Sequence, residues 1–288
     1  MLNLQHVHAF LAVIDSGSFR EASRQLSLAQ PTLSQWVKKL ETELNCPLIE
    51  RNHYQCVPTH QGQLFLPYAK SLLNVAIHLK DRISGKKIVI GAASNIGIYI
   101  MPDKIRQLTI ANQQTLEIEL VISTNPDIIQ KLQNGEIDLA ALEWWDDRPG
   151  FKACAWQREN LVIIVPPHHP WSNKKQVTLE QLVTQPILGG ENGTGTGTRL
   201  TQILNGDADR LKVSQKLGST EAVKRAVMAG MGISLVAQTS VNDEIASHKL
   251  YALKLKNTPL TKQLYLVHHA NLPRQSPIMQ IADQLLNV

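Results

Sequence analysis

The stretch from Ser18 to Leu40 constrains the fold most, because it predicts two short helices joined by a tight turn. Ser18 followed three residues later by Glu21 is a capping-box pattern, which predicts that a helix starts there. Residues 27–29 form the predicted turn. Pro31 suits the first turn of the next helix, where its missing N–H breaks no hydrogen bond. The local prediction is therefore a helix-turn-helix.

The second of these helices has two chemically different faces. Apolar residues spaced four, three and four apart predict a buried stripe of Leu33, Val37, Leu40 and Leu44. The opposite side carries no carboxylate among its five residues, which are Pro31, Ser34, Gln35, Lys38 and Thr42. Gln can pair with adenine through two hydrogen bonds, and Lys reaches guanine or phosphate. This face is typical of a helix in a DNA major groove, and the alternative is a helical hairpin with a merely solvated face.

A dense set of matching residues extends this pattern through the first sixty positions: Leu4-Gln5, Phe10-Leu11-Ala12-Val13, Gly17-Ser18-Phe19, Ala22-Ser23, Leu26, Ala29-Gln30-Pro31-Thr32-Leu33-Ser34, Leu40-Glu41, Leu44, Pro47-Leu48, Glu50-Arg51, Pro58-Thr59 and Gly62. In these residues the chain resembles the DNA-binding domain of LysR-type transcriptional regulators, and the resemblance continues more loosely towards the C-terminus. The chain departs from the family pattern at Leu48-Ile49-Glu50-Arg51, where Leu-Phe-x-Arg is usual. Its segment 53–57 is also less basic than in many members.

The resemblance implies a winged helix-turn-helix over residues 1–58 that binds a double-stranded DNA operator. The candidate DNA contacts are Ser18, Arg20, Gln30, Pro31, Thr32, Ser34, Gln35, Lys38, Arg51 and His53. Arg51 and His53 fall in the expected two-stranded wing, from which they could reach the DNA backbone or the minor groove. For His53, a solvated loop residue is an equally good interpretation.

Residues 59–85 are expected to form a linker helix and a hinge. Phe65, Ala69, Leu72, Ala76, Leu79 and Ile83 repeat at coiled-coil spacing. A single helix standing off a small domain cannot bury such a seam, so we expect it to pair with a second copy. The predicted assembly is a homodimer through this helix, with a tetramer as the expected larger assembly. Pro67 could kink the helix.

Composition places the chain in a broad class. The 288 residues suffice for two domains, and the net charge of +5 permits contact with nucleic acid without proving it. Three cysteines without a metal-binding or disulfide pattern predict reduced thiols. We find no signal peptide and no apolar stretch of membrane-spanning length. The expectation is a cytoplasmic protein without cofactor, metal site, catalytic residues or membrane contact.

From Ile88 onward, apolar strands alternate with helices, which predicts an open parallel sheet of the α/β class. The resemblance implies a two-lobed effector-binding domain, like a periplasmic binding protein, over residues 86–288. We assign lobe I to 86–161 and 267–288, and lobe II to 162–266. The chain is expected to cross between the lobes near Asn160–Val162 and near Leu266–His268.

A glycine-rich loop runs from Glu191 to Arg199 and matches neither phosphate-binding nor dinucleotide-binding patterns. It resembles the Glu-x-Gly-Ser-Gly-Thr-Arg stretch of one LysR-type subgroup, with two residues inserted. Aligned from Arg199, the family Ser and Thr fall on Thr196 and Thr198. Aligned from Glu191, they fall on Thr194 and Thr196. The alternative is a plain glycine-rich connection.

Other hydroxyl and amide side chains follow predicted strands, where open α/β sheets bind ligands. The full candidate set for the effector is Ser94, Asn95, Thr124, Thr196, Thr198, Ser219 and Thr220. Most of these precede predicted helices, whose first turns carry unpaired N–H groups and partial positive charge. This chemistry favours a small anionic metabolite over a bulky apolar one. Trp144 and Trp145 could add a flat wall, although ordinary packing explains them as well.

These features predict a LysR-type DNA-binding transcriptional regulator whose activity responds to a small metabolite bound between two lobes. The rival hypothesis is a cytosolic enzyme or carrier whose N-terminal helices only mediate contacts. The carboxylate-free outer face of residues 31–42 favours the regulator, because an assembly helix has no need of it.

Overall fold

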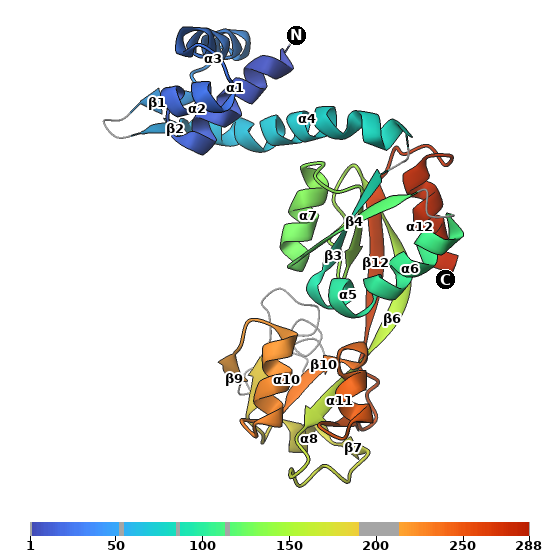
Figure 1. Cartoon of the computed structure of the whole chain (residues 1–288). Helices are drawn as coiled ribbons and strands as arrows, with labels where there is room; N and C mark the ends of the chain where they lie inside the picture. The colour runs from blue at the N-terminus through green and yellow to red at the C-terminus, as the bar shows by residue number, and fades with distance from the viewer. Residues whose placement is uncertain (1, 52–54, 85–86, 113–115, 190–212, 288) are drawn as a thin grey trace. The chain divides into compact units, whose positions relative to one another are not determined.

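The structure is a computed structural model that describes residues 2–51, 55–84, 87–112, 116–189 and 213–287 (Figure 1). The chain divides into two compact units, one made essentially of the first 84 residues and the other of nearly all the rest. The predicted site residues His53, Thr194, Thr196 and Thr198 lie outside the described residues.

The first unit has the expected winged helix-turn-helix order. Its elements are α1 (Leu4–Ser16), α2 (Phe19–Gln25), α3 (Gln30–Leu44), β1 (Ile49–Arg51), β2 (Cys56–Pro58) and α4 (His60–Ser84). The three short helices and the antiparallel β1–β2 pair gather at one end of α4 (Figure 1). This arrangement confirms the two helices, the turn and the wing that the sequence predicts.

Local signals set most helix ends in this unit. Gly17 ends α1 with a φ of 68°, a left-handed conformation that glycine adopts without strain. Ser18 precedes α2 as predicted, but its side chain makes no capping hydrogen bond, so the predicted capping box is wrong. The Ser18 backbone instead contacts the Ser16 hydroxyl, which lies 3.1 Å from the Ser18 carbonyl oxygen.

Two apolar clusters hold the first unit together. One joins α1, α2 and α3 through buried residues that include Phe19, Leu33 and Val37. The other joins α1 to α4 and includes Phe10, Leu40 and Ala69. At Gly62 the backbone of α4 approaches the Leu48 carbonyl so closely that an added Cβ would lie 2.1 Å from its oxygen. Only glycine fits there.

The second unit is built on a mixed sheet with the strand order β4-β3-β5-β12-β6-β11-β7, and β10 also pairs with β6. These strands are β3 (Lys87–Ala93), β4 (Glu117–Ser123), β5 (Leu139–Leu142), β6 (Phe151–Val165), β7 (Gln176–Val177), β10 (Ser234–Ala237), β11 (Tyr251–Leu255) and β12 (Thr261–His269). The strands β3, β4 and β5 are parallel as predicted. The strand β12, however, runs antiparallel to β5 and β6, so the expectation of a wholly parallel sheet is wrong.

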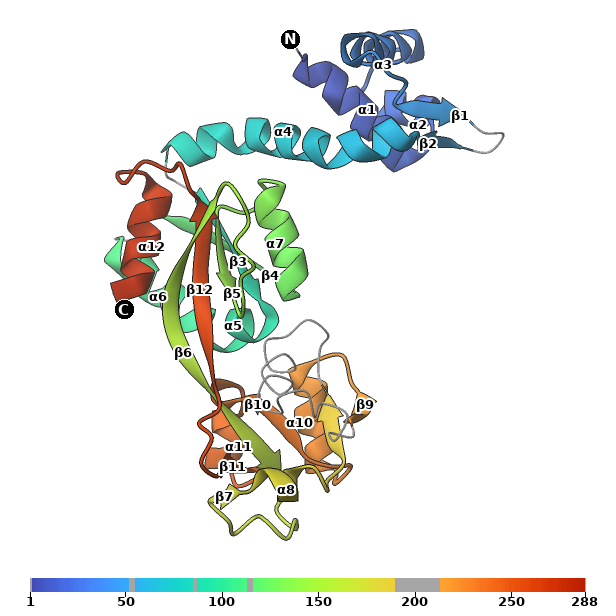
Figure 2. The same cartoon turned by 180° about the vertical axis from the view of Figure 1, so that it is seen from behind.

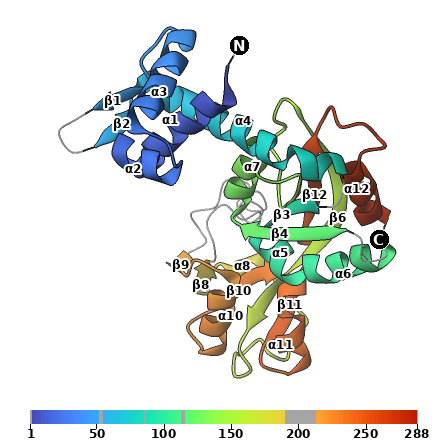
Figure 3. The ribbon, with the colours of Figure 1, turned by 45° about the horizontal axis from the view of Figure 1, so that its top comes forward.

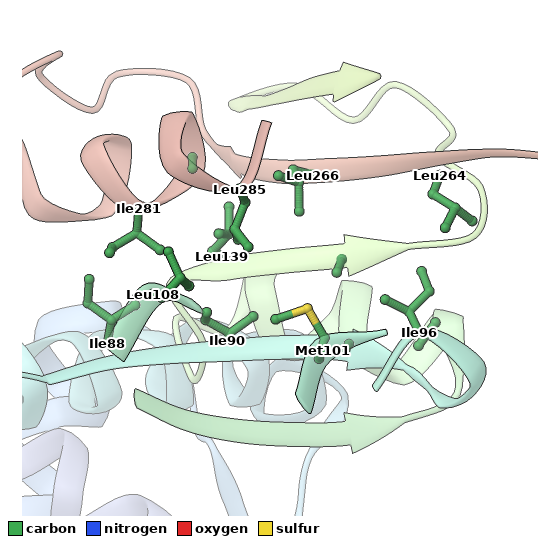
Figure 4. Packing of buried hydrophobic residues seen from close by; sticks show 14 residues of the cluster. Ile88, Ile90, Ile96, Met101, Leu108, Leu139, Leu264, Leu266, Ile281 and Leu285 are labelled. Atoms are coloured by element: carbon green, nitrogen blue, oxygen red, sulfur yellow. The ribbon is translucent and has the colours of Figure 1, made fainter. Parts of the chain in front are cut away.

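Helices cover both faces of the lobe I sheet. On one face lie α5 (Ser94–Tyr99), α6 (Met101–Ala111) and α12 (Pro277–Asn287), and on the other lies α7 (Asn125–Gln133) (Figure 3). Figure 4 shows the core under α6 and α12, where Ile90, Leu139 and Leu266 of the sheet meet Leu108 and Leu285. Apolar residues occupy every second position from 116 to 122, which predicts a strand, and the edge strand β4 forms there.

Lobe II contains the remaining described elements, which are α8 (Leu179–Leu182), β8 (Ile187–Gly189), β9 (Val213–Lys216), α10 (Thr220–Met228), the 3₁₀ helix η2 (Gln238–Val241) and α11 (Asn242–Ala246). Two long strands, β6 and β12, run between the lobes (Figure 2). The strand β6 pairs with β12 up to Asn160 and with β10 from Leu161. The strand β12 pairs with Asn160 of β6 at Thr261 and with β5 only from Tyr265, so the second crossing lies in the first residues of β12, earlier than the expected Leu266–His268.

Candidate functional site

The outer face of α3 is arranged as the sequence predicts. Leu33, Val37 and Leu40 are buried against α1 and α2, which turns the other side of the helix outward. Gln30, Pro31, Gln35, Lys38 and Thr42 are exposed, while Thr32 and Ser34 are half-buried beside them. Arg20 is exposed on α2, and Ser18 is half-buried at its start. The surface therefore presents amide, hydroxyl and ammonium groups together.

Specific hydrogen bonds attach the wing to this pair of helices. The Glu41 carboxylate on α3 accepts the backbone N–H of Leu48 at 2.8 Å and that of Ile49 at 3.1 Å. The Cys56 N–H donates to the Gly17 carbonyl at 2.8 Å, beside the start of α2. Arg51 ends the strand β1. The wing strands are thus held at both the end of α3 and the start of α2.

The predicted seam on α4 is divided between two faces of the helix. Phe65 and Ala69 pack into the core of the first unit, so they are not available to a partner helix. The exposed apolar residues of α4 instead include Leu64, Tyr68, Leu72, Val75 and Leu79, spaced four, four, three and four apart. These five residues, which we call the α4 stripe, lie on one side of the helix. The structure leaves Leu72 and Leu79 of the predicted seam exposed, whereas Phe65 and Ala69 pack inside the first unit, so the seam prediction is wrong for these two residues.

The candidate effector residues of lobe I follow the parallel strands. The Ser94 hydroxyl, after β3, donates to the Ser123 carbonyl at 3.1 Å. The Thr124 hydroxyl, after β4, accepts the N–H of Asp127 at 3.3 Å. Hydrogen bonds from Thr124 and Ser123 hold the pKa of Asp127 below its ordinary value. Both hydroxyls therefore brace the ends of these strands in the structure described.

The candidate residues of lobe II lie at the start of α10. Ser219 is exposed, and its hydroxyl oxygen accepts the N–H of Ala222 at 3.1 Å, which leaves its own O–H available to a ligand. Thr220 is the first residue of this helix and does not precede it, whereas Ser219 is its N-cap residue. Both residues therefore stand where the first turn of α10 begins, as the effector hypothesis requires.

A buried polar network, which the sequence did not predict, includes the candidate residue Asn95 of lobe I. Asn95 is buried, and its amide donates to the Glu143 carboxylate at 3.1 Å. The same oxygen of Glu143 lies 2.8 Å from the ammonium of Lys262, which is on β12. Glu159 on β6 pairs with Lys262 across the two strands and accepts the N–H of Thr239 from lobe II at 3.1 Å. Burial raises the pKa of Glu159 above its ordinary value.

No sequence signal could have found this network, because its members are scattered over more than 160 positions and carry no motif. The tryptophans 144 and 145 are half-buried against the α7 side of the sheet, which agrees with the packing interpretation. Within the described ranges, no helix is long and apolar enough to cross a membrane.

Comparison with protein families decides the class of the chain. Residues 4–63 match the family described as "Bacterial regulatory helix-turn-helix protein, lysR family", and residues 83–288 match the "LysR substrate binding domain". The chain belongs to the LysR family of transcriptional regulators. This family comprises DNA-binding regulators with an effector-binding domain and not enzymes, so the regulator hypothesis replaces the enzyme or carrier hypothesis.

Individual relatives agree with this assignment. This chain is 39% identical over 197 residues to PtxE of Stutzerimonas stutzeri, a protein that is named as a putative HTH-type transcriptional regulator. That match covers 68% of this chain and all of PtxE. The chain shares its fold with full-length CbnR in complex with its target DNA, at a TM-score of 0.75 and 18% identity over 99% of both chains. Its second unit resembles the effector-binding domain of QuiR in complex with shikimate, with a TM-score of 0.62 and 17% identity over 70% of this chain and 95% of that one.

Proposed function

We propose that this LysR-family regulator reads its operator with the exposed face of α3 and with the neighbouring wing. The observation that carries the proposal is the outward face of Gln35, Lys38 and their neighbours, which lacks a carboxylate that DNA phosphates would repel. Gln35 is the residue best suited to pair with a base edge. The proposed contacts are those predicted from the sequence: Ser18, Arg20, Gln30, Pro31, Thr32, Ser34, Gln35, Lys38, Arg51 and His53.

The proposed assembly is a homodimer through the α4 stripe, with a tetramer as a larger form. Five exposed apolar side chains in one row favour burial against a second copy, because large exposed apolar patches mark interaction sites. A two-fold dimer would place two α3 helices on a symmetric operator. The proposed location is the cytoplasm, where the operator is found.

The proposed effector is a small anion bound between the lobes. The hydroxyls of Ser219 and Thr220 and the threonines 196 and 198 would supply neutral hydrogen-bond donors. Ser94, Asn95 and Thr124 of lobe I would exchange their present bonds to Ser123, Glu143 and Asp127 for bonds to the anion. Shikimate, with which the effector-binding domain of QuiR forms its complex, is a carboxylate, and this supports the ligand class by analogy. Closure of the lobes around the anion would change the angle between paired DNA-binding units.

Two experiments test these proposals with the full-length chain. DNA retention should weaken steeply as salt rises, because cation–phosphate contacts release counterions. Small carboxylates, phosphate and sulfate should raise the melting temperature in proportion to the logarithm of their concentration. Thr220→Val and Ser94→Ala should each reduce that rise. If only neutral apolar compounds stabilise the protein and both substitutions leave their effect intact, the anion proposal fails while DNA binding stands.

A further inference from the structure

One side chain of lobe I reaches directly into lobe II. Tyr99 ends α5, and its hydroxyl lies 3.5 Å from a carboxylate oxygen of Glu221 on α10. The ammonium of Lys224, one turn further along α10, donates to the same hydroxyl at 3.4 Å and lies 5.1 Å from the centre of the Tyr99 ring. Burial raises the pKa of the Tyr99 hydroxyl, so it stays a hydrogen-bond donor.

The Lys224 ammonium that contacts Tyr99 is held by acceptors within lobe II. Only 4% of the Lys224 side chain is exposed, and its ammonium lies 2.9 Å from Glu221, 2.8 Å from Glu244 and 2.9 Å from the Ser240 carbonyl oxygen. These three acceptors match the three N–H donors of a lysine, so the longer 3.4 Å contact with the Tyr99 hydroxyl shares one of these donors. Burial disfavours the charged form, but Glu244 and Glu221 outweigh it and raise the pKa of Lys224 above its ordinary value. The cation is therefore fixed in place.

The position of this contact in the chain links it to the proposed effector site. Tyr99 lies on the same short helix as Ser94 and Asn95, and Glu221 directly follows Thr220. We propose that Tyr99 and Lys224 are positioning residues for the effector site, because their contact holds Ser94 and Asn95 of lobe I opposite Ser219 and Thr220 of lobe II. This inference rests on the proposed effector function and adds to it the element that sets the separation of the lobes.

The physical basis is a cation–π and hydrogen-bond contact between two lobes that the strands β6 and β12 also join. The described strands that cross between the lobes are β6 and β12, which are long and can bend. A fixed cation under an aromatic ring restricts that bending and keeps the lobes in a narrow range of separations. A ligand that contacts both lobes binds only to molecules whose lobes have the right separation. The Tyr99 contact raises the fraction of such molecules, and the apparent affinity for the ligand rises with that fraction.

Tyr99→Ala removes the contact, and Tyr99→Phe keeps the ring but removes the hydroxyl. Ile98→Ala is the matched control, because Ile98 is an exposed neighbour on the same helix. Spin labels would be placed on Ile110→Cys in lobe I and Lys254→Cys in lobe II of the full-length chain, with Cys46, Cys56 and Cys154 changed to Ser. Labelled chains would be diluted with unlabelled ones so that distances within one chain dominate. We expect Tyr99→Ala to broaden the distance distribution, and Ile98→Ala to leave it unchanged.

The second measurement titrates the same chains with sulfate as the anion. We expect the dissociation constant to rise about tenfold for Tyr99→Ala and about threefold for Tyr99→Phe. An unchanged distance distribution in Tyr99→Ala overturns the proposal, and so does a broadened distribution with unchanged sulfate affinity. If the unmodified chain binds neither sulfate nor phosphate, the anion site of the proposed function fails. In that case the distance distribution of Tyr99→Ala alone tests whether Tyr99 fixes the separation of the lobes.

Discussion

The ammonium of Lys262 lies 2.8 Å from the Glu143 carboxylate, and the two side chains are only 5% and 2% exposed. Lys262 belongs to a strand that crosses between the lobes, whereas Glu143 follows the lobe I strand β5. A charge pair buried to this degree is sensitive to the loss of either partner, because the remaining charge has no solvent around it.

Lys262→Met should therefore destabilise the effector domain by about 3–5 kcal/mol, since it leaves Glu143 charged and buried. The double variant Glu143→Gln with Lys262→Met should recover most of that loss, because glutamine can still accept the Asn95 amide. Lys254→Met changes an exposed lysine on the strand β11 and is the matched control. Urea unfolding followed by circular dichroism gives the values. A loss below about 1 kcal/mol for Lys262→Met would contradict the importance of the pair.

For Glu159 we predict that the free energy of unfolding changes with pH in the opposite direction to that expected for the carboxylate of a surface ion pair. Burial raises its pKa above the ordinary 4.5, so at a given pH the folded chain holds this proton more firmly than the unfolded chain. The contribution of Glu159 to the free energy of unfolding should fall as the pH rises from about 4.5 through the folded pKa. In Glu159→Gln this fall should be absent, and the variant should be at least as stable as the wild type at neutral pH. Unfolding free energies measured from pH 4 to pH 8 provide the test, and identical profiles for both chains would refute the prediction.

Gln35→Ala should weaken binding to the specific operator by about 1–3 kcal/mol and leave binding to random DNA nearly unchanged. The reason is that an amide paired with a base edge contributes only where the base is correct. Lys38→Ala is the informative comparison, because loss of a phosphate contact weakens binding to every sequence alike. Fluorescence anisotropy at fixed salt, with an operator found by mapping bound genomic fragments, measures both. Equal losses on operator and random DNA for Gln35→Ala would reject base reading by that residue.

Leu72→Asp should disrupt the dimer, because it places a charge in the middle of the α4 stripe. Ile77→Asp is the control, since Ile77 is also exposed on α4 but lies on a different side of the helix. Sedimentation velocity should find monomers for Leu72→Asp and the wild-type assembly for Ile77→Asp. A Leu72→Asp chain that stays dimeric and binds its operator normally would show that another surface joins the copies.

The amino-acid sequence by itself determined the local structure and the class of the N-terminal unit. Gly17, Pro31 and the stripe of Leu33, Val37 and Leu40 act through backbone conformation and helical period, which are properties of neighbouring residues. For the same reason the alternating residues 116–122 predicted the strand β4 correctly. The residues that carry the family resemblance lie in these local patterns, so they could be found without a structure.

Only the tertiary structure decided which residues from distant parts of the chain meet. The pairing of β12 with β5 and β6 made the sheet mixed, because strand direction depends on how the chain returns and not on its apolar pattern. Packing of α4 on α1 buried Ala69, half-buried Phe65 and left Tyr68 and Leu72 exposed, which periodicity alone could not distinguish. The contact of Tyr99 with Lys224 likewise joins residues 125 positions apart. Such contacts depend on the fold that brings the two lobes together, and no local pattern encodes them.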